Sequence, residues 1–262
     1  MKRKTWFWAA TPVAVALSLY GCGNGSDSDL AVDNNAQSCS VVSGTGSAVV
    51  VGSGLPGDPA APEAASGYRL GYKAKQSSNY MVVANTPLAT KAGCDVLKAG
   101  GTAVDAAVAV QAVLGLVEPQ SSTIAGSAFM MYYDAANKKV VAYDGRETAP
   151  AAATGYYLAR QDQSNASSPA PVPSARRSGR SIGVPGVMRM LDMAHKEHGK
   201  LAWAPLFDEG IRMASSGYRI PGRMGDAIRT NAANLQLDAN AVAAYFNADG
   251  TPKTTGTVTT NL

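Results

Sequence analysis

The sequence has 262 residues, of which 46% are hydrophobic and only 16% charged, and its formal net charge at pH 7 is +4. This composition excludes a chain that is disordered throughout, and the 27 glycines and 14 prolines predict many turns around one core. No basic stripe with interleaved aromatic residues accompanies the charge, so we expect no nucleic-acid partner.

Residues 1–21 are predicted to be an export signal. Lys2, Arg3 and Lys4 precede an apolar stretch from Thr5 to Leu19, which is too short to span a membrane. Removing this segment takes away three of the 23 basic residues and none of the 19 acidic ones, which leaves 20 against 19, or a net charge of +1. The basicity of the whole sequence therefore belongs mostly to the signal.

The signal ends in Leu19-Tyr20-Gly21-Cys22, which resembles the bacterial lipobox. We therefore expect a lipid on Cys22 and a protein anchored on the periplasmic side of the bacterial cell envelope. No acidic residue follows at Gly23, which favours the outer membrane. The alternative is an ordinary secretory signal with an incidental cysteine.

Residues 22–79 are predicted to be a flexible tether, because small and polar residues dominate the segment. Gly52–Gly57 matches GxGxxG, but Pro56 and later prolines follow where a dinucleotide site needs a helix, so we reject that site. Cys39 lies in the tether and Cys94 in the folded part. An oxidising compartment permits a bond between them, and two free thiols remain the alternative.

Residues 80–262 are predicted to fold. Met81–Ala84 is expected as a short buried strand, and Thr86 caps a following helix that has Pro87 at its first position and stops at Gly100-Gly101. A second helix from about Ala103 to Leu116 is almost uniformly apolar, which places it at the centre of a layered fold. We interpret Asp105 in its first turn as a helix cap.

A hairpin packed on helices is expected next, with strands at 128–133 and 139–143. A surface loop covers 151–175, and a helix runs from Val187 to about His198. A second amphipathic helix spans 206–216, helical propensity extends from 223 to about 246, and 247–262 is expected as a loop. The inner side of the helix at 206–216 is predicted to carry Leu206, Gly210, Ile211 and Ala214.

Arg146 is the main candidate for binding chemistry. It directly follows the second strand and lies in a turn that contains Gly145 and ends at Pro150, so the backbone is expected to hold it. A fixed guanidinium can bind a carboxylate through two parallel hydrogen bonds, which lysine cannot do. From the residues alone, the alternative is a structural ion pair with Asp144 or Glu147.

Four segments carry a resemblance to a known family: Gly100–Ala107, Glu118–Ser122, Asp144–Pro150 and Gly179–Gly186. Together they resemble the gamma-glutamyltransferase (glutathione hydrolase) family of N-terminal nucleophile hydrolases, over residues 80–230. The resemblance implies an α/β fold, part of a four-layer αββα sandwich that is incomplete in this chain. It also implies that Arg146 binds the α-carboxylate of the gamma-glutamyl group and that Gln120 lies close to the substrate.

As the family implies, the enzyme uses no cofactor and transfers a gamma-glutamyl group from donors such as glutathione to water or amino acids. Its nucleophile is the threonine that precursor self-cleavage exposes at the start of a small subunit. We expect this sequence to stop within the large subunit, before that threonine, and to have little activity alone. The alternatives are a cephalosporin or glutaryl acylase of the same fold and an inactive truncated lipoprotein.

Two further features affect the expected site. Ile124–Phe129 stands where the family has a run of glycines, and its side chains put close approach of substrate in doubt. His195 and His198 lie three residues apart on one helix, but no further ligands have a metal-binding spacing. We expect both histidines to face solvent and predict no metal site.

Overall fold

The computed structural model describes residue 39 and residues 77–260. The chain divides into two units, Met1–Ala31 and Val32–Leu262, and every described residue belongs to the second. The predicted export signal, the lipidation site at Cys22 and nearly all of the tether at 22–79 lie outside the described residues, so they stay predictions. In the described part of the chain, no helix is long and apolar enough to cross a membrane.

The first two helices begin and end where the sequence predicts. α1 (Pro87–Lys98) starts after Thr86, whose hydroxyl accepts a hydrogen bond from the backbone N–H of Ala89. α2 (Ala103–Val117) follows a turn in which Gly100 has a φ of +87°. Left-handed backbone of this kind favours glycine, which is why the first helix stops there.

The predicted buried strand at Met81–Ala84 is wrong. This segment forms no strand, and Met81 and Val83 are exposed. The backbone N–H of Ala84 donates to the hydroxyl of Thr90 in the next helix, so the segment serves as the entry to α1. Four apolar residues without a pairing strand do not make a sheet.

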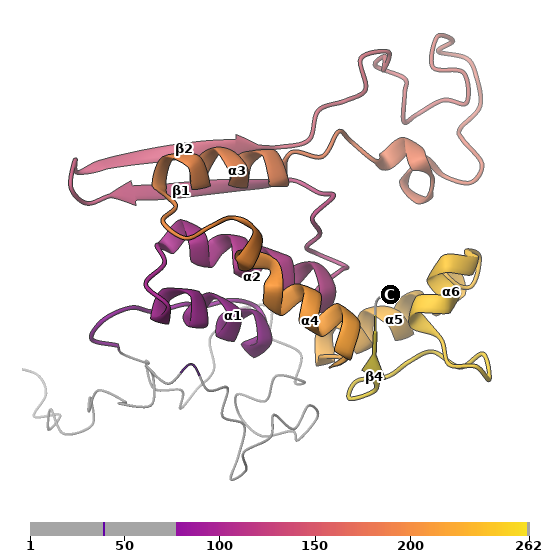
Figure 1. The fold of residues 1–262 in the computed structure, drawn as a ribbon. Helices are drawn as coiled ribbons and strands as arrows, with labels where there is room; N and C mark the ends of the chain where they lie inside the picture. The colour runs from indigo at the N-terminus through magenta and orange to yellow at the C-terminus, as the bar shows by residue number, and fades with distance from the viewer. Residues whose placement is uncertain (1–38, 40–76, 261–262) are drawn as a thin grey trace, which may run out of the picture. The chain divides into compact units, whose positions relative to one another are not determined.

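α2 is the central helix, as its uniform apolarity predicts. One face packs with α1, α4 (Asp208–Ser216), β3 (Tyr218–Arg219) and α5 (Gly222–Leu235) in a first apolar cluster. The opposite face packs with α3 (Val187–His198) and with the hairpin of β1 (Ala128–Asp134) and β2 (Lys139–Gly145) in a second cluster. Figure 1 shows α2 between these neighbours.

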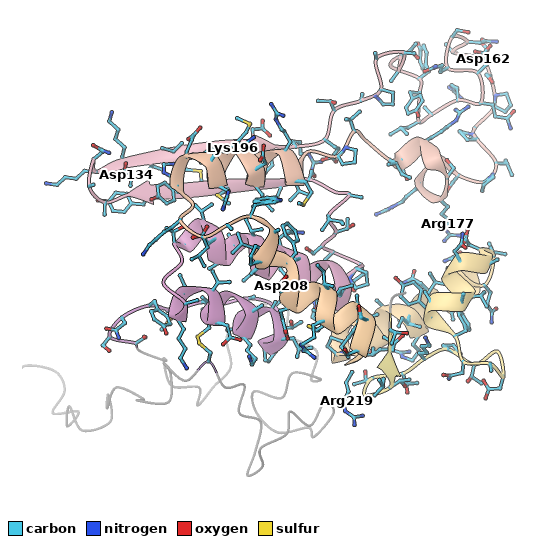
Figure 2. The ribbon with its side chains drawn as sticks, in the orientation of Figure 1. Asp134, Asp162, Arg177, Lys196, Asp208 and Arg219 are labelled. Atoms are coloured by element: carbon cyan, nitrogen blue, oxygen red, sulfur yellow. A yellow bond between two sulfur atoms is a disulfide. The ribbon has the colours of Figure 1, made fainter. Side chains whose placement is uncertain are left out.

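The predicted hairpin is confirmed. β1 (Ala128–Asp134) pairs antiparallel with β2 (Lys139–Gly145), in a register that sets Ala128 opposite Gly145 and Asp134 opposite Lys139. The Asp134 carboxylate accepts hydrogen bonds from two turn amides and marks the tip of the hairpin in Figure 2. α3 covers one face, while the opposite face exposes Phe129, Met131, Tyr133 and Val140.

The segment between the hairpin and α3 is a loop, as predicted, with two short 3₁₀ helices, η3 (Ala175–Arg177) and η4 (Gly179–Ser181). The Arg180 guanidinium organises it by donating to the carbonyl oxygens of Tyr157, Arg160 and Gln161, at 3.2, 2.5 and 2.6 Å. A single cation therefore fixes a loop that has few apolar residues.

The C-terminal elements differ in detail from the prediction. The expected helix at 206–216 is a 3₁₀ turn, η5 (Ala204–Phe207), followed by α4. Ile211, predicted to face inward, is exposed, and Met213 is buried instead, because the position three residues after the buried Gly210 lies on the same helix face. α6 (Ala239–Tyr245) follows α5, and the expected loop at 247–262 contains β4 (Val258–Thr259), which pairs with β3.

Cys39 and Cys94 form a disulfide, with their Cα atoms 5.5 Å apart. The sequence left this pairing open, because nothing in the spacing of the two cysteines required it. The bond attaches residue 39 to the middle of α1.

Candidate functional site

Arg146 follows the last residue of β2, and its backbone is held on both sides. Its N–H donates to the carboxylate of Asp144 at 2.8 Å. Two residues later, Thr148 forms an isolated bridge with Val184, whose N–H donates to the Thr148 carbonyl at 2.9 Å. The expectation that the backbone fixes Arg146 is therefore supported by these contacts.

Three segments that are distant in sequence meet at this strand end. The carbonyl oxygen of Gly126 accepts hydrogen bonds from the N–H groups of Gly186 and Val187, at 3.1 and 3.2 Å. Gly186 also lies against Gly145 so closely that a Cβ on Gly186 would overlap the Gly145 carbonyl. The structure thus brings the predicted motifs at 124–129 and 179–186 to the base of Arg146.

The structural alternative for Arg146 was an ion pair with Asp144 or Glu147. The Arg146 side chain pairs with Glu147 and not with Asp144. One guanidinium nitrogen lies 3.3 Å from the Glu147 carboxylate, while Asp144 binds the backbone instead. The Arg146 side chain is 62% exposed. Because an exposed pair contributes roughly 1 kcal/mol or less and guanidinium has five donors, most of its binding capacity remains available.

Glu147 is kept ionised beside this arginine. A hydrogen bond from the Ser127 hydroxyl lowers the pKa of Glu147 below its usual value, and the positive charge of Arg146 lowers it further. Ser127 is one of the residues that replace glycine in the family pattern, so here its added side chain contacts the carboxylate beside Arg146.

Gln120, the second candidate, lies in a turn anchored by a buried carboxylate. Its amide nitrogen donates to Glu118 at 2.8 Å, and the Ser121 hydroxyl donates to the same oxygen at 3.1 Å. Glu118 is fully buried and also lies 3.2 Å from Arg223 on α5, while its second carboxylate oxygen has no hydrogen-bond partner among the residues that the structure describes. The Gln120 amide nitrogen is thus held by a side chain of its own turn.

Hydrogen bonds hold the loop that follows Gln120. The Gln111 amide on α2 donates to the Ser122 hydroxyl at 3.0 Å and to the Thr123 carbonyl at 3.2 Å. The Thr123 carbonyl also accepts from the N–H of Gly126, the residue that holds the start of α3. The loop from Gln120 to Gly126 is therefore fixed at both ends.

Glu118 and Arg223 were missed by the sequence analysis. Glu118 stands between an apolar helix and Pro119, and a charged residue at that point was a usable signal for a buried anchor. Arg223 lies 105 residues away and carried no such signal, since its partner is set by how α5 packs on α2.

The expectation that His195 and His198 face solvent is wrong. Their side chains are only 15% and 18% exposed. His195 Nε2 lies 2.9 Å from the Leu201 carbonyl and 3.3 Å from Asp105, and His198 stacks on Tyr132 with 4.0 Å between ring centroids. The hairpin covers His198, and the turn at 200–201 together with Trp203 covers His195, which the helix sequence alone could not reveal.

Asp105 caps α2, as predicted, and also joins α2 to the turn after α3. It forms a capping box with Thr102 and accepts hydrogen bonds from the backbone N–H groups of Lys200 and Leu201. Burial alone would raise the pKa of Asp105, but the hydrogen bonds outweigh it and lower that pKa below its usual value.

A half-buried hydrogen bond joins β2 to α3. The Tyr143 hydroxyl donates to Glu197 at 2.5 Å, and burial together with this carboxylate raises the pKa of Tyr143 to about 12. Across residues 39 and 77–260, no three His, Cys, Asp or Glu side chains come together as metal ligands.

Comparisons with known proteins agree on one family. Residues 89–262 match the family model described as gamma-glutamyltranspeptidase. The chain is 36% identical over 182 residues to glutathione hydrolase 3 of Arabidopsis thaliana. The aligned segment covers 69% of this chain and 27% of that protein. It thus spans about a quarter of the length of the curated relatives it matches.

Solved structures agree with the fold. The structure of Helicobacter pylori gamma-glutamyltranspeptidase matches with a TM-score of 0.64 and 26% identity, over 72% of this chain and 52% of that one. A cephalosporin acylase from Bacillus halodurans matches with a TM-score of 0.53 and 25% identity, over 66% of this chain and 32% of that one. The predicted fold class, part of the N-terminal nucleophile hydrolase fold, is confirmed.

Proposed function

The chain belongs to the gamma-glutamyltranspeptidase family, and from this premise we propose that it supplies the donor-binding part of an enzyme that transfers gamma-glutamyl groups. The donors are glutathione-like compounds, and the acceptors are water or amino acids. One observation carries the proposal: the Arg146 backbone is fixed by three converging segments while its guanidinium stays exposed.

Arg146 is proposed to bind the α-carboxylate of the gamma-glutamyl group through two parallel hydrogen bonds. Its contact with Glu147 is a single exposed ion pair, which a substrate carboxylate can displace at little cost. Charge-assisted bidentate pairs are the stronger and more directional interaction. Arg146 thus orients the donor.

Gln120 is proposed to lie beside the bound donor. Its amide nitrogen is held by Glu118, which leaves the amide oxygen as a hydrogen-bond acceptor in a fixed direction. An ammonium group such as the α-amine of a gamma-glutamyl compound would suit that acceptor.

The reaction proposed is the one that the family implies. A threonine that leads a small subunit attacks the gamma-amide carbonyl with its own α-amine as base; the amide C–N bond breaks and the amine leaves with the proton taken from the threonine. Water or an amino acid then attacks the gamma-glutamyl ester, whose C–O bond breaks to restore the threonine hydroxyl. We assign the nucleophile to none of the residues described.

A cephalosporin or glutaryl acylase remains the second candidate, since an acylase of this kind is among the structural matches. A glutaryl group has the same terminal carboxylate as a gamma-glutamyl group but lacks the ammonium. Comparing gamma-glutamyl- and glutaryl-p-nitroanilide therefore separates the two functions. Release of nitroaniline above background would also exclude the third candidate, an inactive lipoprotein.

Titration calorimetry of the full chain with S-methylglutathione tests the carboxylate contact. Arg146→Lys keeps the charge but loses the planar fork, so we expect affinity to fall roughly tenfold. Arg189→Lys, at an exposed arginine on α3, is the matched control and should bind as the native protein does. Equal affinity of all three proteins would contradict the role of Arg146.

We also propose that the protein is a periplasmic lipoprotein attached to the outer membrane through Cys22. The lipobox-like sequence Leu19-Tyr20-Gly21-Cys22 supports this proposal. Cys22→Ser should move the protein from the membrane fraction to the soluble fraction of cells and abolish incorporation of labelled palmitate. Unchanged membrane association of the variant would contradict it.

A further inference from the structure

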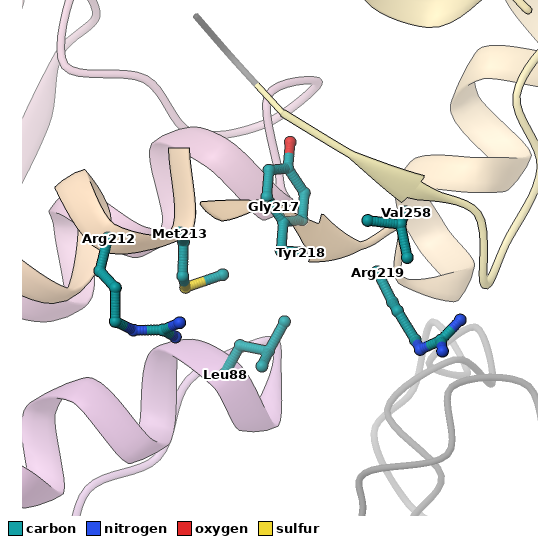
Figure 3. A pocket seen from close by; sticks show the side chains of 7 residues that line it. All are labelled: Leu88, Arg212, Met213, Gly217, Tyr218, Arg219 and Val258. Carbon is teal, nitrogen blue, oxygen red and sulfur yellow. The ribbon is translucent and has the colours of Figure 1, made fainter. Parts of the chain in front are cut away.

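A hollow of about 330 Å³ lies where α1, α4, β3 and β4 meet (Figure 3). Its volume is at the lower end of the range for small-molecule sites, roughly 300–1,000 Å³. It shares no residue with the surroundings of Arg146 or Gln120. The lining residues are Leu88, Arg212, Met213, Gly217, Tyr218, Arg219 and Val258.

The walls of this hollow are mainly apolar. Leu88, Met213 and Val258 each present an aliphatic or thioether side chain from a different element. Tyr218 also lines the hollow. Its hydroxyl donates to the Leu116 carbonyl at 2.9 Å and is therefore not free to bind a ligand. A polar body such as a sugar would lose water here without gaining partners.

The two arginines of the hollow differ in their charge environment. Arg212 donates two hydrogen bonds to the Glu209 carboxylate, both at 2.7 Å, so its charge is neutralised within α4. Arg219 donates one hydrogen bond to the Gly256 carbonyl at 3.0 Å. Within residues 77–260, no carboxylate lies within ion-pair distance of Arg219.

We propose that this hollow binds a small anionic amphiphile, namely an acyl carboxylate of medium length. The carboxylate pairs with Arg219, and the alkyl chain lies against Leu88, Met213 and Val258. The positive charge of Arg219 favours a carboxylate head group, and the apolar lining favours an alkyl chain. This site is separate from the proposed gamma-glutamyl site and does not depend on it.

The test uses decanoate below its micelle concentration, added to the full chain labelled at its methyl groups. Nuclear magnetic resonance should show saturable shifts of the Leu88, Met213 and Val258 methyls. Decanol, which lacks the charge, and decyltrimethylammonium, which reverses it, should bind at least about fivefold more weakly, as expected for loss of one exposed ion pair.

Two variants locate the site. Arg219→Gln should weaken decanoate binding about fivefold, whereas Arg189→Gln should leave it unchanged. Val258→Trp fills the hollow from an exposed position on β4 and should abolish the shifts of Leu88 and Met213, with circular dichroism confirming that the variant is folded. Decanoate binding that is absent, that shifts methyls elsewhere, or that persists equally in Arg219→Gln would overturn the proposal.

Discussion

Gly186, the residue before α3, lies directly against the carbonyl oxygen of Gly145 at the end of β2. A Cβ at Gly186 would overlap that oxygen and would also lie 3.3 Å from the Arg146 carbonyl. The start of the helix and the base of the arginine are therefore in contact through backbone alone. This contact needs glycine for lack of space, since the φ of Gly186 is an ordinary −121°.

Gly186→Ala should destabilise the protein by about 1–3 kcal/mol, because the added methyl must displace backbone. It should also weaken binding of S-methylglutathione, since the displaced atoms position Arg146. Urea denaturation and calorimetry measure the two effects. Gly155→Ala is the control, because a Cβ there has nothing within 4 Å; equal behaviour of the two variants would contradict the close approach.

Arg223→Leu should destabilise the protein by about 2–4 kcal/mol, because it leaves the buried Glu118 carboxylate without its cation. The matched control is Arg229→Leu, which breaks the exposed pair with Asp226 and should cost no more than about 1 kcal/mol. Adding Glu118→Gln to Arg223→Leu should restore part of the loss, as urea denaturation of the double variant would reveal. Additive losses would argue against a coupled pair.

Asp105→Asn should lower the free energy of unfolding at neutral pH by about 1–3 kcal/mol, since the backbone N–H groups of Lys200 and Leu201 lose a charged acceptor. The pKa of Asp105 is lowered by folding, so its ionised form stabilises the native state above the unfolded pKa of about 3.9. This contribution disappears as the pH falls below that value toward the folded pKa. The difference between native protein and variant should therefore shrink in acid, and a constant difference would contradict the assignment.

Cys94→Ala should lower the free energy of unfolding by about 3–4 kcal/mol, because it opens a loop closed across a sequence separation of 55. A reducing agent should have the same effect on the native protein and none on the variant. Thermal unfolding followed by circular dichroism measures both. A reductant effect that persists in Cys94→Ala would show that another cause is at work.

The sequence predicted best where local rules decide the structure. Thr86 caps α1 and Asp105 caps α2 as predicted, and two apolar runs around the polar turn at 134–138 predict the hairpin directly. The prediction failed where the outcome depends on what packs nearby. Met81–Ala84 has the composition of a strand, but in the described residues it pairs with no other strand. His195 was predicted to be exposed, but the turn at 200–201 covers it.

The same distinction between local rules and packing applies to the candidate site. Arg146 and the motifs at its base were identified from the family resemblance, and the structure brings those motifs together. The Glu118–Arg223 pair was missed, because two residues 105 positions apart become neighbours only through the packing of α5 on α2. The end of an apolar helix was a usable signal for a buried anchor at Glu118, but which cation lies against it is a tertiary property that no local pattern gives.

If the proposed lipid on Cys22 attaches the protein to a membrane, the disulfide between Cys39 and Cys94 sets how far the folded body can stand from it. The chain between the lipid and the disulfide then runs only from residue 22 to residue 39, a separation of 17 residues. Fully stretched at about 3.4 Å per residue it reaches roughly 60 Å, against roughly 200 Å for all of 22–79. Reduction of this one bond would therefore let the same body sweep a much larger radius above the lipid surface.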